Sequence, residues 1–145
     1  EGYEHTGFYN LKYLPRRGDL NTGDQNLTNP NNYRAIRYAD VLLMAAEALS
    51  RGGIDEGRAR LYLNEVRLRA NLSEISSSGI DLTNDIYKER RLELVGEGHR
   101  FFDLVRTNTA SENIEGFVTG KHEVFPIPSI EIDLTGNRWS QNPGY

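Results

Sequence analysis

The sequence predicts a mainly helical protein in which an antiparallel helical hairpin is followed by further helices and long loops, while residues 8–14 could be a short strand or an extended segment. Apolar residues recur at helical spacing in residues 34–50 and again in residues 55–71, and Gly52-Gly53 separates the two stretches. The apolar segment 124–128 contains two prolines, which lack the N–H group that an internal strand donates. These observations favour helices over a sheet.

Length and composition exclude several classes of protein. The 145 residues are enough for one domain with a buried core, and the absence of cysteine excludes disulfide frameworks, thiol catalysis and cysteine-ligated metals. The net charge of −4 offers no overall attraction to nucleic acid, so we expect no such partner. No run approaches the roughly 20 apolar residues that a membrane-spanning helix needs.

Residues 1–33 form a loop-rich leading segment, because Asn, Asp, Gly and Pro accumulate in it after the first aromatic residues. Tyr9, Tyr13 and Trp139 are aromatic residues in stretches that we expect to be irregular. Aromatic rings in loops either stack on the apolar C–H face of a sugar or anchor the loop to the helices. We retain these three residues as candidate ligand-binding residues.

Residues 34–106 are the predicted helical core. Its first helix, residues 34–50, is apolar on almost all sides, which indicates burial by its neighbours. Asp40 and Glu47 interrupt that surface and need polar partners if they are buried. Asp55 is the predicted N-cap of the second helix, which completes the hairpin.

The rest of the chain contains a third helix and shorter elements. The third helix is predicted from near Leu82 to about residue 95, where glycines weaken it, and a shorter helix continues through Arg106. Residues 107–145 are predicted to be an extended tail that packs on the helices. Within it, residues 107–122 are loop-like, and Ser129 caps a single helical turn.

The densest group of charged residues lies at the end of the core. Glu89, Glu93 and Glu97 are four residues apart, so an unbroken helix would place them on one side. Paired carboxylates are the acid and base of glycosidases, which makes a glycoside hydrolase fragment one alternative. The favoured interpretation is structural, because acids and arginines at this spacing form ion pairs that hold helices together.

No other pattern in the sequence supports catalysis. The three histidines share no helical spacing, and the glycines form neither a phosphate-binding loop nor a dinucleotide-binding motif. Oxygen-bearing residues alternate between Asp19 and Asn26, but the glutamate that closes a calcium loop is absent. We expect no catalytic residue, no metal ion and no cofactor.

Four stretches, taken in order, resemble the C-terminal portion of the SusD/RagB family. They are Arg37–Ala48, Leu63–Ala70, Glu89–Arg106, and Phe125–Pro128 with Gln141–Tyr145. The resemblance implies an all-α protein with tetratricopeptide-like helical pairs and long ordered loops, and residues 34–70 have about the length of one such unit. It also implies a buried structural ion-pair network of Asp40, Glu47, Arg67, Glu89, Glu93, Arg100 and Asp103.

The resemblance further implies a function without catalysis. Members of this family are surface-exposed outer-membrane lipoproteins that capture a polysaccharide or oligosaccharide for a SusC-like TonB-dependent transporter. The chain would then be the C-terminal portion of a longer protein, and a missing N-terminal portion would carry the lipid anchor. A generic tetratricopeptide-like scaffold that binds peptides in a helical groove is the second alternative.

Overall fold

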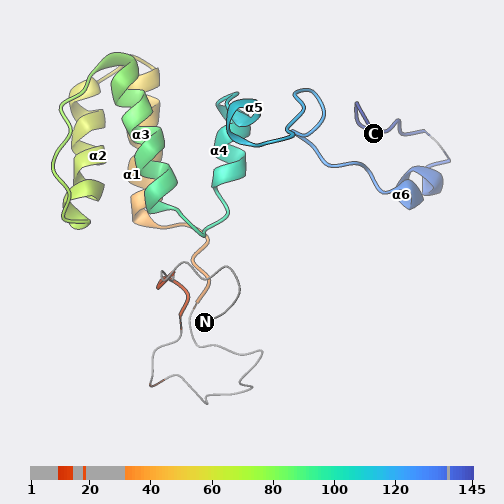
Figure 1. The fold of residues 1–145 in the computed structure, drawn as a ribbon, viewed down its shortest axis with the longest axis horizontal. Helices are drawn as coiled ribbons and strands as arrows, with labels where there is room; N and C mark the ends of the chain where they lie inside the picture. The colour runs from red at the N-terminus through yellow and green to blue at the C-terminus, as the bar shows by residue number, and fades with distance from the viewer. Residues whose placement is uncertain (1–9, 15–17, 19–31, 137) are drawn as a thin grey trace. The chain divides into compact units, whose positions relative to one another are not determined.

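The computed structural model describes residues 10–14, 18, 32–136 and 138–145, and it contains helices but no strand within them (Figure 1). The helices are α1 (Tyr38–Arg51), α2 (Glu56–Arg69), α3 (Gly79–Glu93), α4 (Arg100–Arg106), α5 (Ala110–Asn113) and α6 (Ser129–Leu134). The prediction of an all-α protein is confirmed. The chain divides into two compact units, with the boundary between Gly96 and Glu97.

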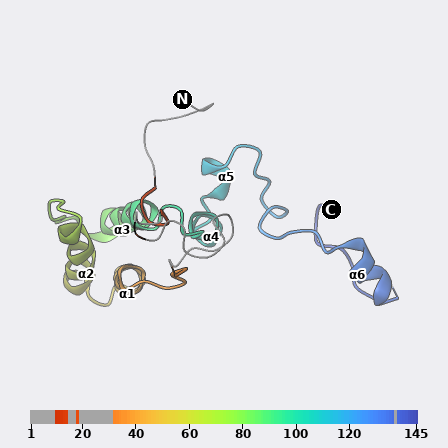
Figure 2. The same ribbon diagram turned by 90° about the horizontal axis from the view of Figure 1, so that it is seen from below.

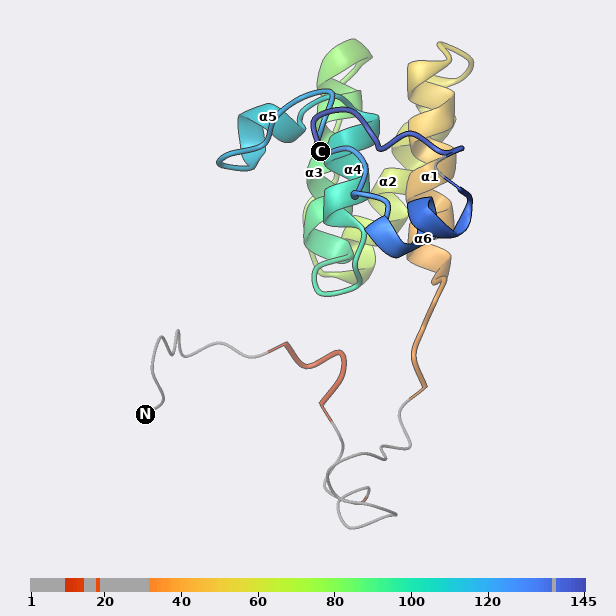
Figure 3. The ribbon, with the colours of Figure 1, turned by 90° about the vertical axis from the view of Figure 1, so that its right-hand side faces the viewer.

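The first unit is a bundle of three helices, in which α1 contacts both α2 and α3, and α2 contacts α3. The three helices lie together in Figures 1 and 2, and their axes run alongside one another in Figure 3. Ala46 of α1 and Ala59 of α2 are fully buried, and such small side chains let two helix backbones approach closely. The core of the unit consists of Leu42, Leu43, Ala46, Ala59, Leu63, Val66, Leu82 and Ile86.

The helix boundaries follow local chemistry, with two differences from the sequence-based prediction. Asp55 caps α2 as expected, because its Oδ1 accepts the N–H of Arg58 at 2.9 Å. The first helix begins at Tyr38 rather than residue 34, since Arg37 has extended backbone angles. α3 begins at Gly79, three residues before Leu82, where the Gly79 N–H donates to a carboxylate oxygen of α2.

The loop that joins α2 to α3 is ordered by side chains of α2. Asn64 is buried and forms a pair of hydrogen bonds with the backbone of Ile75, at 2.8 and 3.0 Å. Arg67 donates to the carbonyl oxygen of Ser73 at 2.9 Å, and Arg60 donates to that of Ser77 at 3.1 Å. These contacts satisfy backbone groups that would otherwise need water.

In the second unit, the side-chain amide of Gln141 binds the proline-containing segment 125–128. Ile127 lies between Pro126 and Pro128, so it carries the one backbone N–H of these three residues. That N–H donates to Oε1 of Gln141 at 2.8 Å, and Nε2 of Gln141 returns a 2.8 Å bond to the Ile127 carbonyl. The segment is therefore extended without being a strand.

In the predicted tail, the turn at Ser129 is found, whereas residues 107–122 differ from the predicted loop. Residues 107–122 are not entirely loop, because α5 forms a short helix in which Asn113 donates to the carbonyl of Thr109 at 2.8 Å. The predicted turn at Ser129 is present as α6. That the tail packs on the helices of residues 34–106 stays a prediction.

Candidate ligand-binding site

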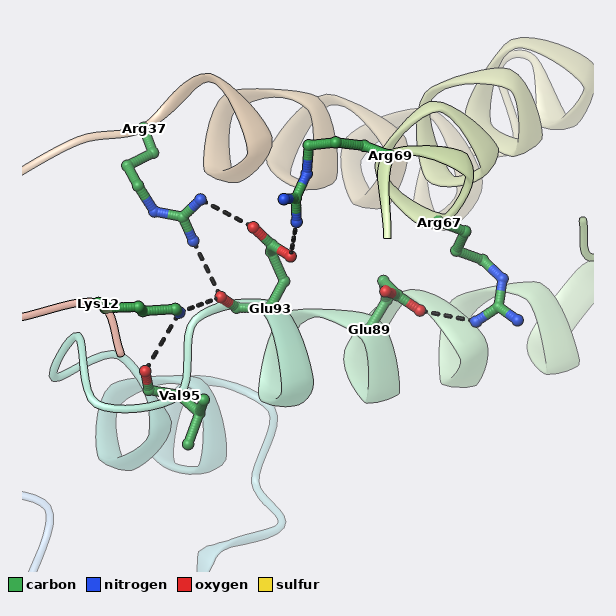
Figure 4. A network of polar contacts seen from close by, with 7 residues as sticks. All are labelled: Lys12, Arg37, Arg67, Arg69, Glu89, Glu93 and Val95. Carbon is green, nitrogen blue, oxygen red and sulfur yellow. Dashed lines mark hydrogen bonds and ion pairs between the residues drawn. The ribbon is translucent and has the colours of Figure 1, made fainter. Parts of the chain in front are cut away.

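Residues 10–14 are attached to the C-terminal end of α3 by a lysine. The Nζ atom of Lys12 donates to the carbonyl oxygens of Glu93 and Val95, the latter at 3.2 Å (Figure 4). A helix leaves its last carbonyl groups unpaired and carries partial negative charge at that end. An ammonium group at this end donates hydrogen bonds to the unpaired carbonyl groups and offsets the partial negative charge. Lys12 therefore fixes the path of residues 10–14.

Glu93 connects the ends of all three helices of the first unit. Its Oε1 accepts from Arg37, just before α1, at 2.7 Å, and its Oε2 accepts from Arg69 at the end of α2 at 2.5 Å (Figure 4). Arg37 also donates to the Glu93 carbonyl at 2.9 Å. Both carboxylate oxygens are therefore occupied by guanidinium groups, and the same corner of the unit receives Lys12.

Gly96 brings the chain after α3 close to Asn10. Its φ of +78° lies in the left-handed region, and a Cβ atom at this position would come within 2.4 Å of the Asn10 side-chain nitrogen. The backbone conformation favours glycine, and an added Cβ would force the Asn10 side chain to move.

We expect Gly96→Ala to loosen residues 10–14 and to lower the free energy of unfolding by roughly 1–3 kcal/mol. Hydrogen exchange of the amides of residues 10–14, together with urea denaturation, measures both effects. Gly98→Ala is the matched control, because Gly98 also has a positive φ but has no atom within 4 Å of the added Cβ. Equal effects of the two substitutions would show that the contact with Asn10 is unimportant.

An aromatic pair lies beside this attachment. The rings of Tyr13 and Tyr33 are stacked, with centroids 6.5 Å apart and planes inclined by 13°. Tyr33 is 74% exposed, so its ring remains accessible to a ligand. Arg34 donates to the carbonyl oxygen of Lys12 at 3.4 Å, which places residues 33 and 34 next to residues 12 and 13.

The other predicted ligand-binding residues are not part of this pair. Tyr9 lies outside the described residues, and so do all the oxygen-bearing residues from Asp19 to Asn26. Trp139 belongs to the second unit and is 55% exposed. Tyr33 was missed by sequence analysis, although an aromatic residue directly before the first helix was a usable signal.

The second unit contains an apolar hollow of about 330 Å³, a size at the lower end for small-molecule sites. Phe101 and His122 pack against Phe117, with ring centroids 6.5 and 5.7 Å from it. Phe125 and Tyr145 complete the aromatic lining. Trp139 is not among the residues that line this hollow.

A turn beside this hollow carries a carboxylate with an altered pKa. The backbone N–H of Gly120 donates to Oε1 of Glu123 at 2.9 Å. This hydrogen bond stabilises the ionised form and lowers the pKa of the Glu123 carboxyl below its usual value. The interaction fixes the turn of residues 120–123.

In the first unit, the members of the predicted network form ion pairs, and most of their side chains are buried. Asp40 and Arg90 form a 2.7 Å pair between α1 and α3, and both side chains are at most 7% exposed. Arg67 of α2 binds Glu89 of α3 at 2.7 Å. Glu47 is buried and accepts from Arg51 of the same helix at 3.1 Å.

The two remaining members of the predicted network lie in the second unit. Asp103 pairs at 2.7 Å with Arg106, whose side chain is 38% exposed. Arg100 is exposed and donates to Asn113 at 3.2 Å, which differs from the expected burial. The physical reason is that Gly96 and Gly98, both with positive φ, interrupt the helix before α4.

This interruption also changes the geometry expected for a hydrolase. α3 ends at Glu93, so Glu97 does not continue the helical side that carries Glu89 and Glu93. Glu89 and Glu93 are bound by arginines. Within the described part of the chain, no three metal-ligating side chains come together, and no helix has the length and apolar character to cross a membrane.

The fold and these contacts define a helical, tetratricopeptide-like protein with ordered loops. Comparison of the sequence with known families then identifies it further: the sequence model of the SusD family matches residues 1–124, and the chain belongs to this family. SusD-like protein P2 of Formosa agariphila is 33% identical over 140 residues. That match covers 85% of this chain and 28% of the relative, so the chain spans little more than a quarter of the relative's length.

Solved structures agree with the family assignment. Surface glycan-binding protein A of Bacteroides uniformis is 35% identical with a TM-score of 0.71, and the match covers 97% of this chain and 33% of that one. A SusD homologue of Bacteroides thetaiotaomicron is 34% identical, also with a TM-score of 0.71, and the match covers 79% and 26% of the two chains. The prediction of SusD/RagB membership is confirmed.

Proposed function

We propose that the chain is part of a cell-surface protein that captures a polysaccharide or oligosaccharide without cleaving it. The observation that carries the proposal is the exposed Tyr13–Tyr33 stack, held at the end of α3, in a member of the SusD family. The similarity to a surface glycan-binding protein over 97% of the chain supports it. Tyr9 and Trp139 remain candidate ligand-binding residues, each considered apart from the stack.

Capture by an aromatic platform needs no proton transfer. A pyranose ring presents an apolar C–H face that packs on an exposed tyrosine ring, while hydroxyl groups at its edge bind backbone and side-chain polar groups. Two of the three carboxylates named for the hydrolase alternative are bound by arginines, since Glu89 binds Arg67 and Glu93 binds Arg37 and Arg69. The geometry thus favours binding over hydrolysis.

The proposal includes a place and a partner. We place the protein on the outer membrane, exposed at the cell surface and held by a lipid anchor on an N-terminal portion outside this chain. It would deliver its ligand to a SusC-like TonB-dependent transporter. Crosslinking on intact cells should join the protein to a TonB-dependent transporter identified by mass spectrometry, and recovery of the protein in the cytoplasmic fraction would contradict this placement.

Calorimetric titration with a panel of soluble polysaccharides should show saturable binding, with no sugar released. We expect Tyr33→Ala to weaken that binding about tenfold, because it removes the exposed ring of the stack. Tyr38→Ala is the matched control, since Tyr38 is also exposed, at 68%, but is not part of the stack.

Three other results would decide against the proposal. Release of sugars would favour the hydrolase alternative. Binding of peptides without binding of any glycan would favour the scaffold alternative. Equal affinities of the Tyr33→Ala and Tyr38→Ala variants would remove the tyrosine stack from the site.

A further inference from the structure

The segments of the sequence that carry the tyrosine stack have a charge opposite to that of the whole chain. The described segments 10–14 and 32–37 contain Lys12, Arg34 and Arg37, and they contain no acidic residue. The sequence from residue 10 to residue 37 has five basic and two acidic residues, a net charge of +3, whereas the whole chain has −4. The positive charge is therefore concentrated in the part of the sequence that carries the stack.

Two of these three cations have structural roles. Lys12 donates to the carbonyl groups at the end of α3. Arg37 binds the carboxylate and the carbonyl of Glu93. These contacts explain why both residues are basic without reference to any ligand.

Arg34 has no such role. Its side chain is exposed, and its hydrogen bond goes to the neutral carbonyl oxygen of Lys12, at the weak distance of 3.4 Å. No carboxylate pairs with it in the described part of the chain, whereas Arg67, Arg69 and Arg90 of the helices each bind one. A guanidinium has five N–H donors in a planar arrangement, and among the described residues only one bond of Arg34 is found, to the Lys12 carbonyl.

We propose that the Tyr13–Tyr33 stack binds an acidic glycan, in which Arg34 holds a carboxylate or sulfate group of the sugar. Tyr33 contacts Tyr13 and Arg34 contacts Lys12, so the exposed ring and the guanidinium lie against neighbouring residues of one segment. A uronic acid or a sulfated sugar carries its charge on a substituent of the ring that stacks. Arginine binds such planar or tetrahedral oxyanions through two parallel N–H donors.

This inference rests on the proposed function and makes it more specific. Stacking alone accepts many sugar rings, because each has an apolar face. A guanidinium beside the stack adds a preference for charged sugars, and that preference must weaken as salt screens it. The two contributions can be separated experimentally, because they come from different side chains.

The test compares acidic glycans with neutral partners of the same backbone. Polygalacturonate is paired with its methyl ester and dextran sulfate with dextran, so the two arms distinguish a carboxylate from a sulfate. Each is titrated into the 145-residue chain at low and high sodium chloride. We expect about tenfold tighter binding of at least one acidic glycan than of its neutral partner, and loss of that difference in Arg34→Gln.

Arg138→Gln is the matched control. Arg138 is exposed and adjacent to Trp139, so it repeats the pairing of an exposed arginine with an aromatic residue in the second unit. The preference should survive this substitution. Loss of the preference in Arg138→Gln but not in Arg34→Gln would assign the acidic group to the second unit and overturn the inference.

The remaining outcomes separate the two proposals. In one outcome, acidic and neutral glycans bind equally, Tyr33→Ala weakens their binding and Arg34→Gln does not. That outcome would overturn the inference and leave the proposed function intact. Absence of binding to every glycan would contradict both. An acidic preference that does not change with salt would also contradict the role of Arg34.

Discussion

Asp40→Ala is expected to destabilise the first unit by roughly 3–5 kcal/mol, because it leaves the guanidinium of Arg90 buried without its carboxylate. The Arg90 and Asp40 side chains are 5% and 7% exposed, and their 2.7 Å contact joins α1 to α3. A buried charge that loses its partner costs more than the pair itself contributed. Urea denaturation followed by circular dichroism at 222 nm should show a strongly lowered midpoint, or a chain that is already unfolded in buffer.

Asp81→Ala is the matched control for that substitution. Asp40 and Asp81 are each the third residue of a helix, α1 and α3 respectively, but Asp81 is exposed. We expect Asp81→Ala to cost less than about 1 kcal/mol, the usual effect of an acidic residue near a helix N-terminus.

The double variant Asp40→Leu, Arg90→Met tests why Asp40→Ala lowers the stability. If the damage comes from an unpaired buried charge, replacing both partners by apolar residues of similar volume should recover most of the lost stability. Equal loss in the single and double variants would mean that the pair specifies the packing of α1 on α3 in some other way. A fully stable Asp40→Ala variant would show that the loss of the Asp40 carboxylate does not leave an uncompensated buried charge on Arg90.

Leu43→Ala is expected to lower the free energy of unfolding by roughly 2–5 kcal/mol, since it removes three buried carbon atoms and leaves a cavity. Leu43 is 0% exposed and belongs to the cluster formed by α1, α2 and α3. The same denaturation experiment measures the change.

Met44→Ala provides the comparison for Leu43→Ala. Met44 is the next residue of the same helix and is 45% exposed, and alanine is the better helix former. A change of less than about 1 kcal/mol is expected, which is usual for substitutions away from the core. A large effect of Met44→Ala in the 145-residue chain would contradict the assignment of the core face of α1.

The sequence was sufficient for the helical hairpin because its signals are local. Helical spacing of apolar residues, the cap at Asp55 and the glycine pair at 52–53 all act within a few residues. α2 formed close to the predicted limits, and α1 ended where predicted but began four residues later. The family could also be recognised from ordered motifs without any structure, and the family comparison agrees over residues 1–124. The start of α3 and the presence of α5 were not recovered, because Ser-rich and polar stretches resemble loops.

The partners in the site were decided by the tertiary structure. Sequence spacing indicated that Glu93 needs a cation, but Arg37 and Arg69 are 56 and 24 residues away from it. The stack of Tyr33 on Tyr13 likewise joins residues separated by most of the leading segment. Which side chains meet depends on how α1, α2 and α3 cross, and helical periodicity indicates the buried face of each helix but not the residues that it meets. The sequence by itself thus determined a helical member of the SusD family, whereas only the packed helices decided which charges and rings stand together at the end of α3.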